Sequence, residues 1–307
     1  QEVALLREGD SAGELYLCAM SATVDTQKLA DYLGAQVVST PAVTHPLEVT
    51  YHPHPERAQG SPAFYRHVAE QAKHGERTLV FVPGVREVDL VCGFLDDAAP
   101  LHGRLTSKEQ DAALNGDARV VVATSVAESS ITVPGVNRVV DAGLSRVPRR
   151  DAARAMTGLV TVSSAKTSAD QRAGRAGRLG PGEVLRAYSQ PDYQHFNADI
   201  APEITTADLT SAALTIAAWG SPDLPLLTPP PAKALDDAQR TLRDLGALDD
   251  EGITTLGEKL AAMPLDPRLG TALLRHGSGA ARTVVALAEG TSGDLARAQA
   301  PRKQVER

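Results

Sequence analysis

The chain has 307 residues, of which 42% are hydrophobic and 22% are charged, and its formal net charge is −7. At about 100–200 residues per domain, this length predicts two or three domains with ordinary globular cores. No apolar run approaches the roughly 20 residues that cross a bilayer, so we expect no membrane-spanning helix in this sequence. Cys18 and Cys92 lie in separate apolar stretches, and we expect two small buried side chains in a protein of the reducing cytoplasm.

The charge is unevenly distributed along the chain. Residues 141–178 carry eight basic and three acidic side chains, a local charge of +5, so the remaining residues sum to −12. A basic surface on an acidic body is compatible with a polyanionic partner such as nucleic acid. A solvated charged face explains the same numbers, and charge alone leaves both interpretations open. The basic residues are Arg146, Arg149, Arg150, Arg154, Lys166, Arg172, Arg175 and Arg178.

The first part of the chain shows one strand and helix followed by a break. Residues 15–19 form an apolar run that is typical of a buried strand, and Thr26–Leu33 has helical periodicity. Residues 37–38 predict a further short strand. The following segment is rich in Pro and His and interrupts the pattern, so we place a domain boundary near Pro46.

From residue 47 onward, short apolar strands alternate with amphipathic helices. Thr106 and Glu109 have the spacing of a capping box at the start of one of these helices. The alternation predicts an α/β fold with a parallel sheet covered on both faces, in which ligands bind at the carboxyl ends of the strands. The predicted strands are residues 47–51, 78–82, 99–101, 120–123 and 137–141, and the predicted helices are residues 64–72, 85–95 and 106–114.

The pattern changes after Tyr188. Residues 207–219 and 232–245 predict two helices that are joined by a Pro-rich linker. Residues 247–255 then predict a hairpin, and residues 256–262 predict another short helix. Two helices followed by a hairpin indicate a mainly α, winged-helix module.

The most specific chemical pattern is the segment Gln171-Arg172-Ala173-Gly174-Arg175-Ala176-Gly177-Arg178. Helical spacing places Gln171, Arg175 and Arg178 on one face, where two guanidinium groups form a fork that suits phosphate oxygens. Gly174 and Gly177 remove side-chain bulk and allow a neighbouring surface to approach. A solvated Arg-rich helix would leave both glycines unexplained, because each costs about 1 kcal/mol relative to Ala within a helix.

Three weaker patterns also follow predicted strands. The loop at residues 124–136 contains five hydroxyl side chains that are suited to phosphates or sugar hydroxyls. Ser21-Ala22-Thr23 follows the first predicted strand, and Gly84 follows the strand at residues 78–82. Each of these three patterns is weak evidence of function by itself.

Together and in this order, the four patterns resemble superfamily two helicases of the DEAH-box RNA helicase type. Val139-Val140-Asp141-Ala142-Gly143 resembles the strand that precedes the long hairpin of this family. Segments at residues 202–204, 217–220 and 264–268 are similar to the C-terminal region of the bacterial HrpB-type subgroup. The resemblance covers residues 15–274 and implies a RecA-like sheet followed by a winged-helix module.

The resemblance implies ATP with Mg²⁺ and RNA, single-stranded or duplex with an overhang, as ligands. By this resemblance, Gln171, Arg175 and Arg178 face the γ-phosphate and its attacking water, and Ser130, Thr132 and Gly174 join the arginines at the nucleotide. It also implies that Gly84, Thr124, Ser125, Arg149 and Arg150 contact RNA, with residues 146–154 in the hairpin, and that Ser21, Thr23 and Ser130 couple nucleotide state to domain movement.

The sequence departs from the family pattern at several points. Pro134 stands where the family often has an acidic residue, and residues 108–114 lack the aromatic that relatives place against adenine. Neither a GxxxxGK[ST] loop nor an Asp-Glu-x-His segment is present. The chain therefore lacks the elements that cradle phosphates and hold Mg²⁺, and we expect it to be inactive alone.

These departures predict a fragment in which residues 1–45 end a first RecA-like domain. Residues 46–200 would form the second RecA-like domain, residues 201–265 a winged-helix domain, and residues 266–307 the start of a helical, ratchet-like domain. Two other interpretations stay open: a non-catalytic half-helicase that binds RNA or a helicase, and an α/β protein whose partner is another protein.

Overall fold

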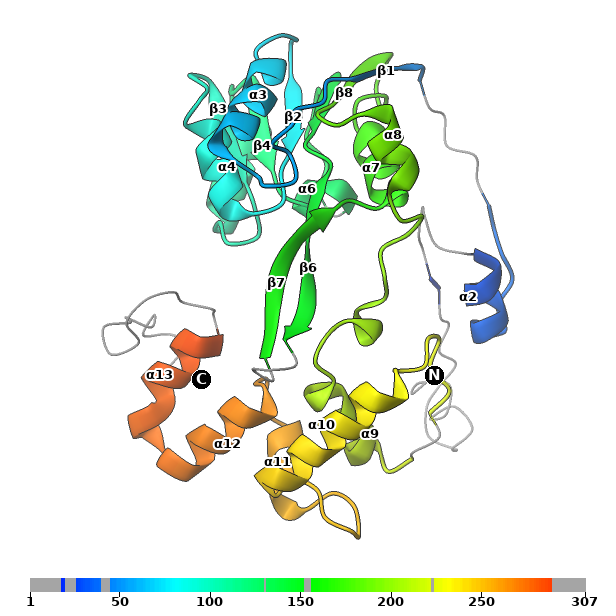
Figure 1. Ribbon diagram of the computed structural model, residues 1–307, viewed down its shortest axis with the longest axis vertical. Coiled ribbons are helices and arrows are strands. Elements are labelled where there is room, and N and C mark those ends of the chain that lie inside the picture. The colour runs from blue at the N-terminus through cyan, green and yellow to red at the C-terminus, as the bar shows by residue number, and fades with distance from the viewer. Residues whose placement is uncertain are drawn as a thin grey trace. The chain divides into compact units, whose positions relative to one another are not determined.

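The computed structural model describes residues 18–19, 26–39, 45–129, 131–151, 156–221 and 224–288 (Figure 1). Its contacts divide the chain into two compact units. The first comprises residues 1–147 and 159–200, and the second comprises residues 148–158 and 201–307. The sheet lies in the first unit, and the longer run of consecutive helices lies in the second.

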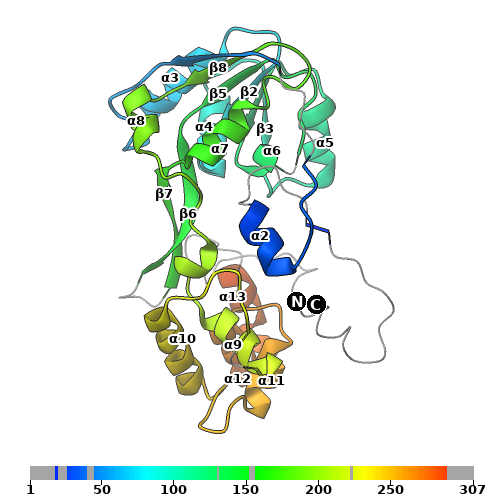
Figure 2. The same ribbon diagram turned by 90° about the vertical axis from the view of Figure 1, so that its right-hand side faces the viewer.

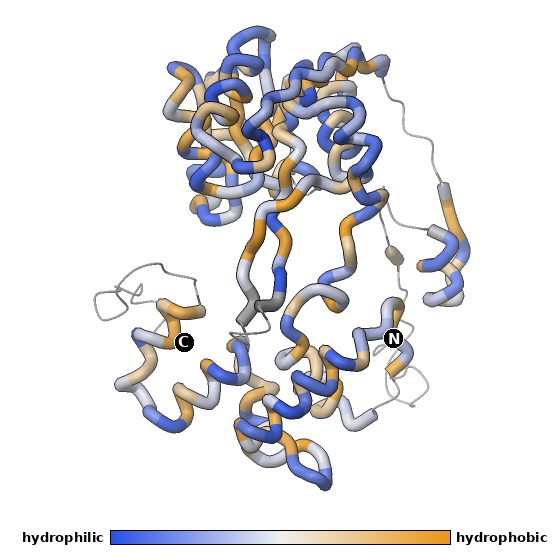
Figure 3. Tube along the Cα trace, viewed as in Figure 1, coloured by the Kyte–Doolittle hydropathy of each residue, from blue (hydrophilic) through white to orange (hydrophobic). Residues whose placement is uncertain are grey.

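A six-stranded sheet forms the centre of the first unit. Its strand order is β1-β8-β5-β2-β4-β3, and every neighbouring pair is parallel, which confirms the predicted sheet. Strands β2 and β4 are fully buried, and Figure 3 shows hydrophobic and hydrophilic residues mixed along the trace of this unit. The strands are β1 (Leu47–Tyr51), β2 (Thr78–Phe81), β3 (Ala98–Leu101), β4 (Val120–Ala123), β5 (Arg138–Asp141) and β8 (Gly182–Arg186).

Helices cover both faces of the sheet because its strands are apolar on both faces. Alternate residues of β2 show this directly: Val80 packs with α3 and α4, whereas Leu79 and Phe81 pack with residues of α5, α6 and α7. The helices are α3 (Pro62–Ala72), α4 (Val85–Cys92), α5 (Ser107–Asn115), α6 (Val126–Ser129) and α7 (Lys166–Ala173), with α8 (Gln190–His195) after β8. The predicted capping box of α5, with Thr106 and Glu109, is confirmed.

A two-stranded ribbon interrupts the strand–helix alternation between β5 and α7. It consists of β6 (Leu144–Asp151) and β7 (Met156–Ser163), as Figure 2 shows, and corresponds to the hairpin that the family resemblance implies. The chain enters β6 through Gly143, whose φ is +67°. A Cβ atom at Gly143 would collide with the ring of Tyr188, so this turn requires glycine.

The second unit is mainly helical. Its core contains Leu214 of α9, Leu242 of α10 and Leu260 of α11. The predicted hairpin is reduced to one antiparallel bridge between Leu248 and Ile253. The helices are α9 (Thr210–Trp219), α10 (Ala232–Leu245), α11 (Thr255–Ala261), α12 (Pro267–His276) and α13 (Ser278–Ala288), and a 3₁₀ helix spans Glu203–Thr205.

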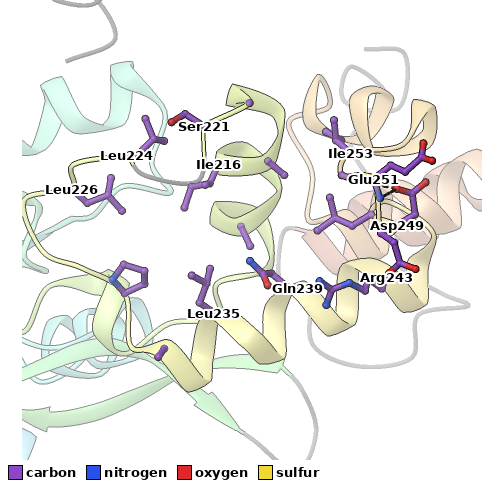
Figure 4. Close-up of a pocket in the computed structure, with 18 residues that line it drawn as sticks. Ile216, Ser221, Leu224, Leu226, Leu235, Gln239, Arg243, Asp249, Glu251 and Ile253 are labelled. Atoms are coloured by element: carbon purple, nitrogen blue, oxygen red, sulfur yellow. Dashed lines mark hydrogen bonds between the residues drawn. The ribbon is translucent and has the colours of Figure 1, made fainter.

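A cavity of about 820 Å³ lies within this second unit, between α9, α10 and the turn that joins Leu248 to Ile253. Leucine side chains, including Leu224 and Leu235, line one end (Figure 4). The charged side chains of Arg243, Asp249 and Glu251 lie at the other end (Figure 4). The cavity is therefore amphipathic and lined entirely by residues of one unit.

Some predictions for the N-terminal segment were wrong. The predicted helix is confirmed as α2 (Thr26–Leu33), but residues 37–38 form no strand. Val38 is 89% exposed, and no strand among the described residues pairs with it. Cys18 is exposed rather than buried, because no described part of the chain covers it, and Cys92 is half-buried. The predicted strand at residues 15–19 lies mostly outside the described residues.

Candidate functional site

The parallel sheet brings the predicted polar loops to one edge. In the register of the central strands, Phe81 of β2 is level with Ala123 of β4 and with Asp141 of β5. Gly84, Thr124 and the turn at Gly143 therefore follow neighbouring strands on the carboxyl side of the sheet. Thr124 is half-buried, and Ser125 is exposed.

Two arginines join this edge from the segment after α7. The spacing predicted one continuous helix through residue 178, but α7 ends at Ala173 and Gly174 is its C-cap. Arg175 and Arg178 therefore lie in a turn and a bend beyond the helix, where the N–H groups of Arg175 and Ala176 donate to the carbonyl oxygens three residues earlier, at 3.1 and 3.0 Å. Gln171 remains on α7 and is half-buried.

Both arginine side chains are held by the loop that follows β4, which includes the short helix α6. Arg175 donates from Nε to the carbonyl oxygen of Glu128 at 3.1 Å, and its Nη2 donates to the same oxygen. Arg178 donates from Nη1 to Oγ1 of Thr132 at 2.5 Å. A cavity of about 230 Å³ lies between this loop and the arginines, with Pro134 and Leu179 in its wall.

The two guanidinium groups lie close enough to repel one another. Burial lowers the pKa of Arg175, and the positive charge of Arg178 lowers it further, against the opposing effect of Glu128. An anion bound between these side chains would relieve the repulsion and gain charge-assisted hydrogen bonds from both. This arrangement is chemically suited to a phosphate group.

The glycines of this segment have different roles. A Cβ atom at Gly177 would lie 2.9 Å from Cδ2 of Leu47 and 3.1 Å from the carbonyl oxygen of His45, so Gly177 permits the close approach that the sequence predicts. A Cβ atom at Gly174 would meet only carbonyl oxygens of α7, at 3.4 Å or more. Of these two glycines, therefore, Gly177 permits a close approach by another described segment and Gly174 does not.

Gly84 is less accessible than its position after a strand predicted. It is buried, because the guanidinium group of Arg146 and the carboxylate of Glu87 lie directly over it. Arg146 donates from Nη2 to Oε1 of Glu87 at 3.2 Å, and Oε2 of Glu87 has no hydrogen-bond partner among the described atoms. A basic side chain from the ribbon therefore stands at the position that was predicted for the backbone contact.

Arg172 is the residue that sequence reasoning missed. Its side chain is 3% exposed and forms ion pairs with Asp141 at 2.8 Å and with Glu128 at 3.0 Å. Burial alone would lower the pKa of Arg172, but the two carboxylates raise it overall. The only sequence signal was the acidic residue within each neighbouring motif, at Glu128 and Asp141.

The remaining predicted residues are only partly described. Ser21, Thr23 and Ser130 lie outside the described residues, as does the side chain of Arg150. Arg149 is exposed on β6. Where the structure describes the chain, no group of three His, Cys, Asp or Glu side chains could hold a metal ion, and no helix is long and apolar enough to span a membrane.

Comparison with known protein families agrees with this geometry. Residues 62–180 match the family described as the helicase conserved C-terminal domain, which contains β2, β4, β5 and both arginines. This part of the chain is a helicase C-terminal domain. Residues 238–265, after that domain, match the helicase associated domain (HA2), winged-helix.

Several helicases are similar over most of the chain. The ATP-dependent RNA helicase HrpB of Escherichia coli (strain K12) is 35% identical, covering 85% of this chain and 34% of the relative. The pre-mRNA-splicing factor ATP-dependent RNA helicase prp22 of Schizosaccharomyces pombe (strain 972 / ATCC 24843) is 32% identical, covering 85% of this chain and 24% of the relative. The chain therefore spans about a third or less of the length of these relatives.

Solved structures show the same fold around the helicase C-terminal domain. A crystal structure of the Escherichia coli DEAH/RHA helicase HrpB matches with a TM-score of 0.83 and 32% identity, covering 94% of this chain and 40% of that one. A second crystal structure, of the E. coli DExH-box NTPase HrpB, has a TM-score of 0.77 at the same identity and covers 93% of this chain and 39% of that one. The chain thus has the RecA-like fold of a helicase C-terminal domain and a following helicase-associated winged-helix segment.

Proposed function

We propose that this chain is the second half of an ATP-dependent RNA helicase core and supplies Arg175 and Arg178 to the γ-phosphate of ATP. The observation that carries the proposal is the pairing of these two side chains at the carboxyl edge of a RecA-like sheet. Each is anchored to the loop after β4, through Glu128 and Thr132. Arginines in this role stabilise the charge that develops during phosphoryl transfer.

The described side chains of this site can bind the phosphate oxygens of ATP, but they cannot hold its Mg²⁺ ion. Guanidinium groups donate hydrogen bonds to phosphate oxygens but cannot bind Mg²⁺, and the described residues contain no cluster of acidic or histidine side chains that could. A separate domain would therefore hold ATP and Mg²⁺, the bound nucleotide supplying the phosphoryl group that is hydrolysed. In this chain, Gln171, Thr132, Ser130 and Gly174 would complete the surface that faces the nucleotide.

RNA would follow the same carboxyl edge of the sheet. Thr124 and Ser125 offer hydroxyl groups and Gly84 a backbone N–H, all suited to phosphates, which position nucleic acid without reading its sequence. Arg146 already lies over Gly84 and would reach a phosphate there before the backbone does. Arg149 and Arg150 on β6 would also contact RNA, and Ser21 and Thr23 would transmit the nucleotide state.

The first prediction concerns ATP hydrolysis. The isolated chain should release no phosphate from ATP above background, because it has neither a phosphate-binding loop nor an acidic Mg²⁺ motif. A longer protein that joins this chain to a nucleotide-binding domain should hydrolyse ATP and be stimulated by RNA. Phosphate release, measured for both proteins with and without single-stranded RNA, checks this.

Two outcomes would contradict the proposal. Robust turnover by the isolated chain, with contaminants excluded by a second purification, would place the catalytic centre elsewhere. RNA binding by the longer protein without any ATP hydrolysis would favour a non-catalytic half-helicase.

We also propose that the protein is located in the cytoplasm. We propose domain limits at residues 46–200, 201–265 and 266–307.

A further inference from the structure

The buried side chain of Arg172 uses all three of its nitrogens. Its Nε donates to Oε2 of Glu128 at 3.0 Å, and Nη1 donates to Oδ1 of Asp141 at 2.8 Å. Nη1 also donates to Oγ of Ser164 at 2.9 Å, and Nη2 donates to Oγ of Ser145 at 2.9 Å. The guanidinium lies 5.4 Å from the ring centre of Phe81, so its position is fixed by packing as well.

These contacts join both ends of the β6–β7 ribbon at its junction with the sheet. Ser145 lies at the start of β6, and Ser164 lies directly after β7. Their hydroxyl oxygens are 2.9 Å apart, and the backbone N–H of Ser164 donates to the carbonyl oxygen of Gly143 at 3.0 Å. Arg172 therefore contacts both ends of the ribbon at the point where they join the sheet.

On its other side, Arg172 contacts the residue that holds Arg175. The carboxylate of Glu128 accepts from Arg172, and the carbonyl oxygen of the same residue accepts from Arg175. Asp141 is fixed from three directions, by Arg172, by the hydroxyl of Tyr188 at 3.0 Å and by the backbone N–H of Gly143 at 2.9 Å. Three contacts thus connect the base of the ribbon to Arg175: Ser145 to Arg172, Arg172 to Glu128, and Glu128 to Arg175.

We propose that Arg172 is a positioning residue that transmits the placement of the β6–β7 ribbon to Arg175, so that RNA on the ribbon sets the geometry of the arginine at the nucleotide. This inference rests on the proposed function and extends it to the regulation of the same site. Arg172 is itself buried, so it would touch neither nucleotide nor RNA. The planar guanidinium is needed because its divergent N–H groups reach Glu128 and both serines at once, which an ammonium group cannot reproduce.

The test needs a change that is milder than the loss of Arg172. Removing that side chain would leave the carboxylates of Glu128 and Asp141 buried without a counter-charge. The protein would then fail to fold, and the variant would say nothing about Arg175. Ser145→Ala removes one hydroxyl at the base of the ribbon and keeps every charge in place. Ser145→Thr restores the hydroxyl, and Ser163→Ala is the matched control, because Ser163 accepts from Arg57 rather than from Arg172.

The experiment uses the longer protein with its nucleotide-binding domain, with thermal melting to verify folding. In Ser145→Ala, kcat at saturating RNA should fall about tenfold, because a hydrogen bond to a charged group is lost from the connection to Arg175. The KM for ATP, the ATPase rate without RNA and the RNA affinity without nucleotide should stay unchanged. Ser145→Thr should recover the stimulated rate, and Ser163→Ala should retain it.

Each other outcome overturns the inference. Equal RNA stimulation in Ser145→Ala and the parent would show that the ribbon acts on the nucleotide by another route. Equal losses of the rate with and without RNA, or a matching loss in Ser163→Ala, would show a structural effect only. If the longer protein without substitutions hydrolysed no ATP, the proposed function and this inference would both be refuted. The ATPase assay of that unsubstituted protein therefore distinguishes failure of the proposed function from failure of the inference alone.

Discussion

At the scale of single residues, the chemistry depends on which arginine faces which partner. Arg172 is buried between two carboxylates, whereas Arg175 and Arg178 contact the loop after β4 through a carbonyl and a hydroxyl oxygen. A carboxylate neutralises its arginine, but a carbonyl or hydroxyl oxygen leaves the positive charge available. Of these three arginines, therefore, only Arg175 and Arg178 have a positive charge that is available to bind a phosphate.

The first residue-scale prediction concerns Arg178, tested in the longer protein with its nucleotide-binding domain. Arg178→Ala should reduce kcat for ATP hydrolysis by about 10³-fold, the size expected for an arginine that stabilises phosphoryl transfer. Arg178→Lys should not restore the rate, because an ammonium cannot replace the planar fork. RNA affinity measured without nucleotide should barely change. Full ATPase activity combined with lost RNA binding would place Arg178 on the RNA surface instead.

The sequence predicts that Arg175 and Arg178 lie close together, but it does not predict the surroundings of their neighbour Arg172. The spacing of Arg175 and Arg178 with two glycines is specific, and the structure places both at one edge of the sheet. Arg172 has the same residue type in the same motif, and its distinguishing partners lie 31 and 44 residues away in the chain. Only folding brings Asp141 and Glu128 to it, so its burial could not be predicted locally.

At the scale of elements, the predictions succeeded where a pattern is satisfied locally. The capping box of α5 and the helix at Ala232–Leu245, which ends at Gly246, need only neighbouring residues. Five of the six sheet strands were also predictable, because they are short and apolar, whereas β8 was not predicted. Residues 37–38 were apolar too, but a strand needs a pairing partner, and the sequence does not say whether one is present. The end of α7 at Gly174 was missed because the arginine spacing continued a helical pattern that the backbone does not follow.

An ion pair between elements of the helical unit gives a prediction for acid stability. Asp208, which precedes α9, accepts from the N–H of Thr210 at 2.9 Å and pairs with Arg268 of α12 at 3.3 Å. Burial alone would raise the pKa of Asp208, but the hydrogen bonds from Thr210 and the contact with Arg268 lower it overall, below its ordinary value of 3.8. Asp208 therefore stabilises the fold fully above that value, and the contribution is lost as the pH falls through the lower pKa of the folded state.

Asp208→Asn should consequently melt at a lower temperature than the parent at pH 5–7, and the difference should shrink as the pH falls below about 4. Thermal melting of both proteins between pH 3 and pH 7 measures this. Asp236→Asn removes an acidic charge from the exposed face of α10 and controls for the change in net charge. A difference between Asp208→Asn and the parent that grows on acidification would reverse the assigned sign.

At the scale of the whole molecule, the distribution of charge matters more than its sum. The net charge of −7 combines +5 over residues 141–178 with −12 elsewhere. The basic share includes the ribbon residues Arg146 and Arg149, both of which have access to solvent. A polyanion would therefore be attracted to one segment and repelled by the rest of the protein, which favours a defined path over diffuse binding.

The last prediction tests this distribution through salt. If Arg146, Arg149 and Arg150 each neutralise one phosphate of single-stranded RNA, log Kobs should fall with log salt concentration with a slope of about −2, since each contact contributes about −0.7. The double variant Arg149→Gln/Arg150→Gln should shift the slope toward zero by about 1.4 and weaken binding equally for different RNA sequences. Arg240→Gln is the matched control, because it removes a basic charge from the exposed surface of α10, outside the basic segment. Fluorescence anisotropy with a labelled oligonucleotide gives the affinity at each salt concentration. A series from about 50 to about 300 mM salt then gives the slope of log Kobs against log salt concentration. An unchanged slope in the double variant, or an equal shift in Arg240→Gln, would mean that RNA is attracted by some other surface and that the basic segment is a solvated face.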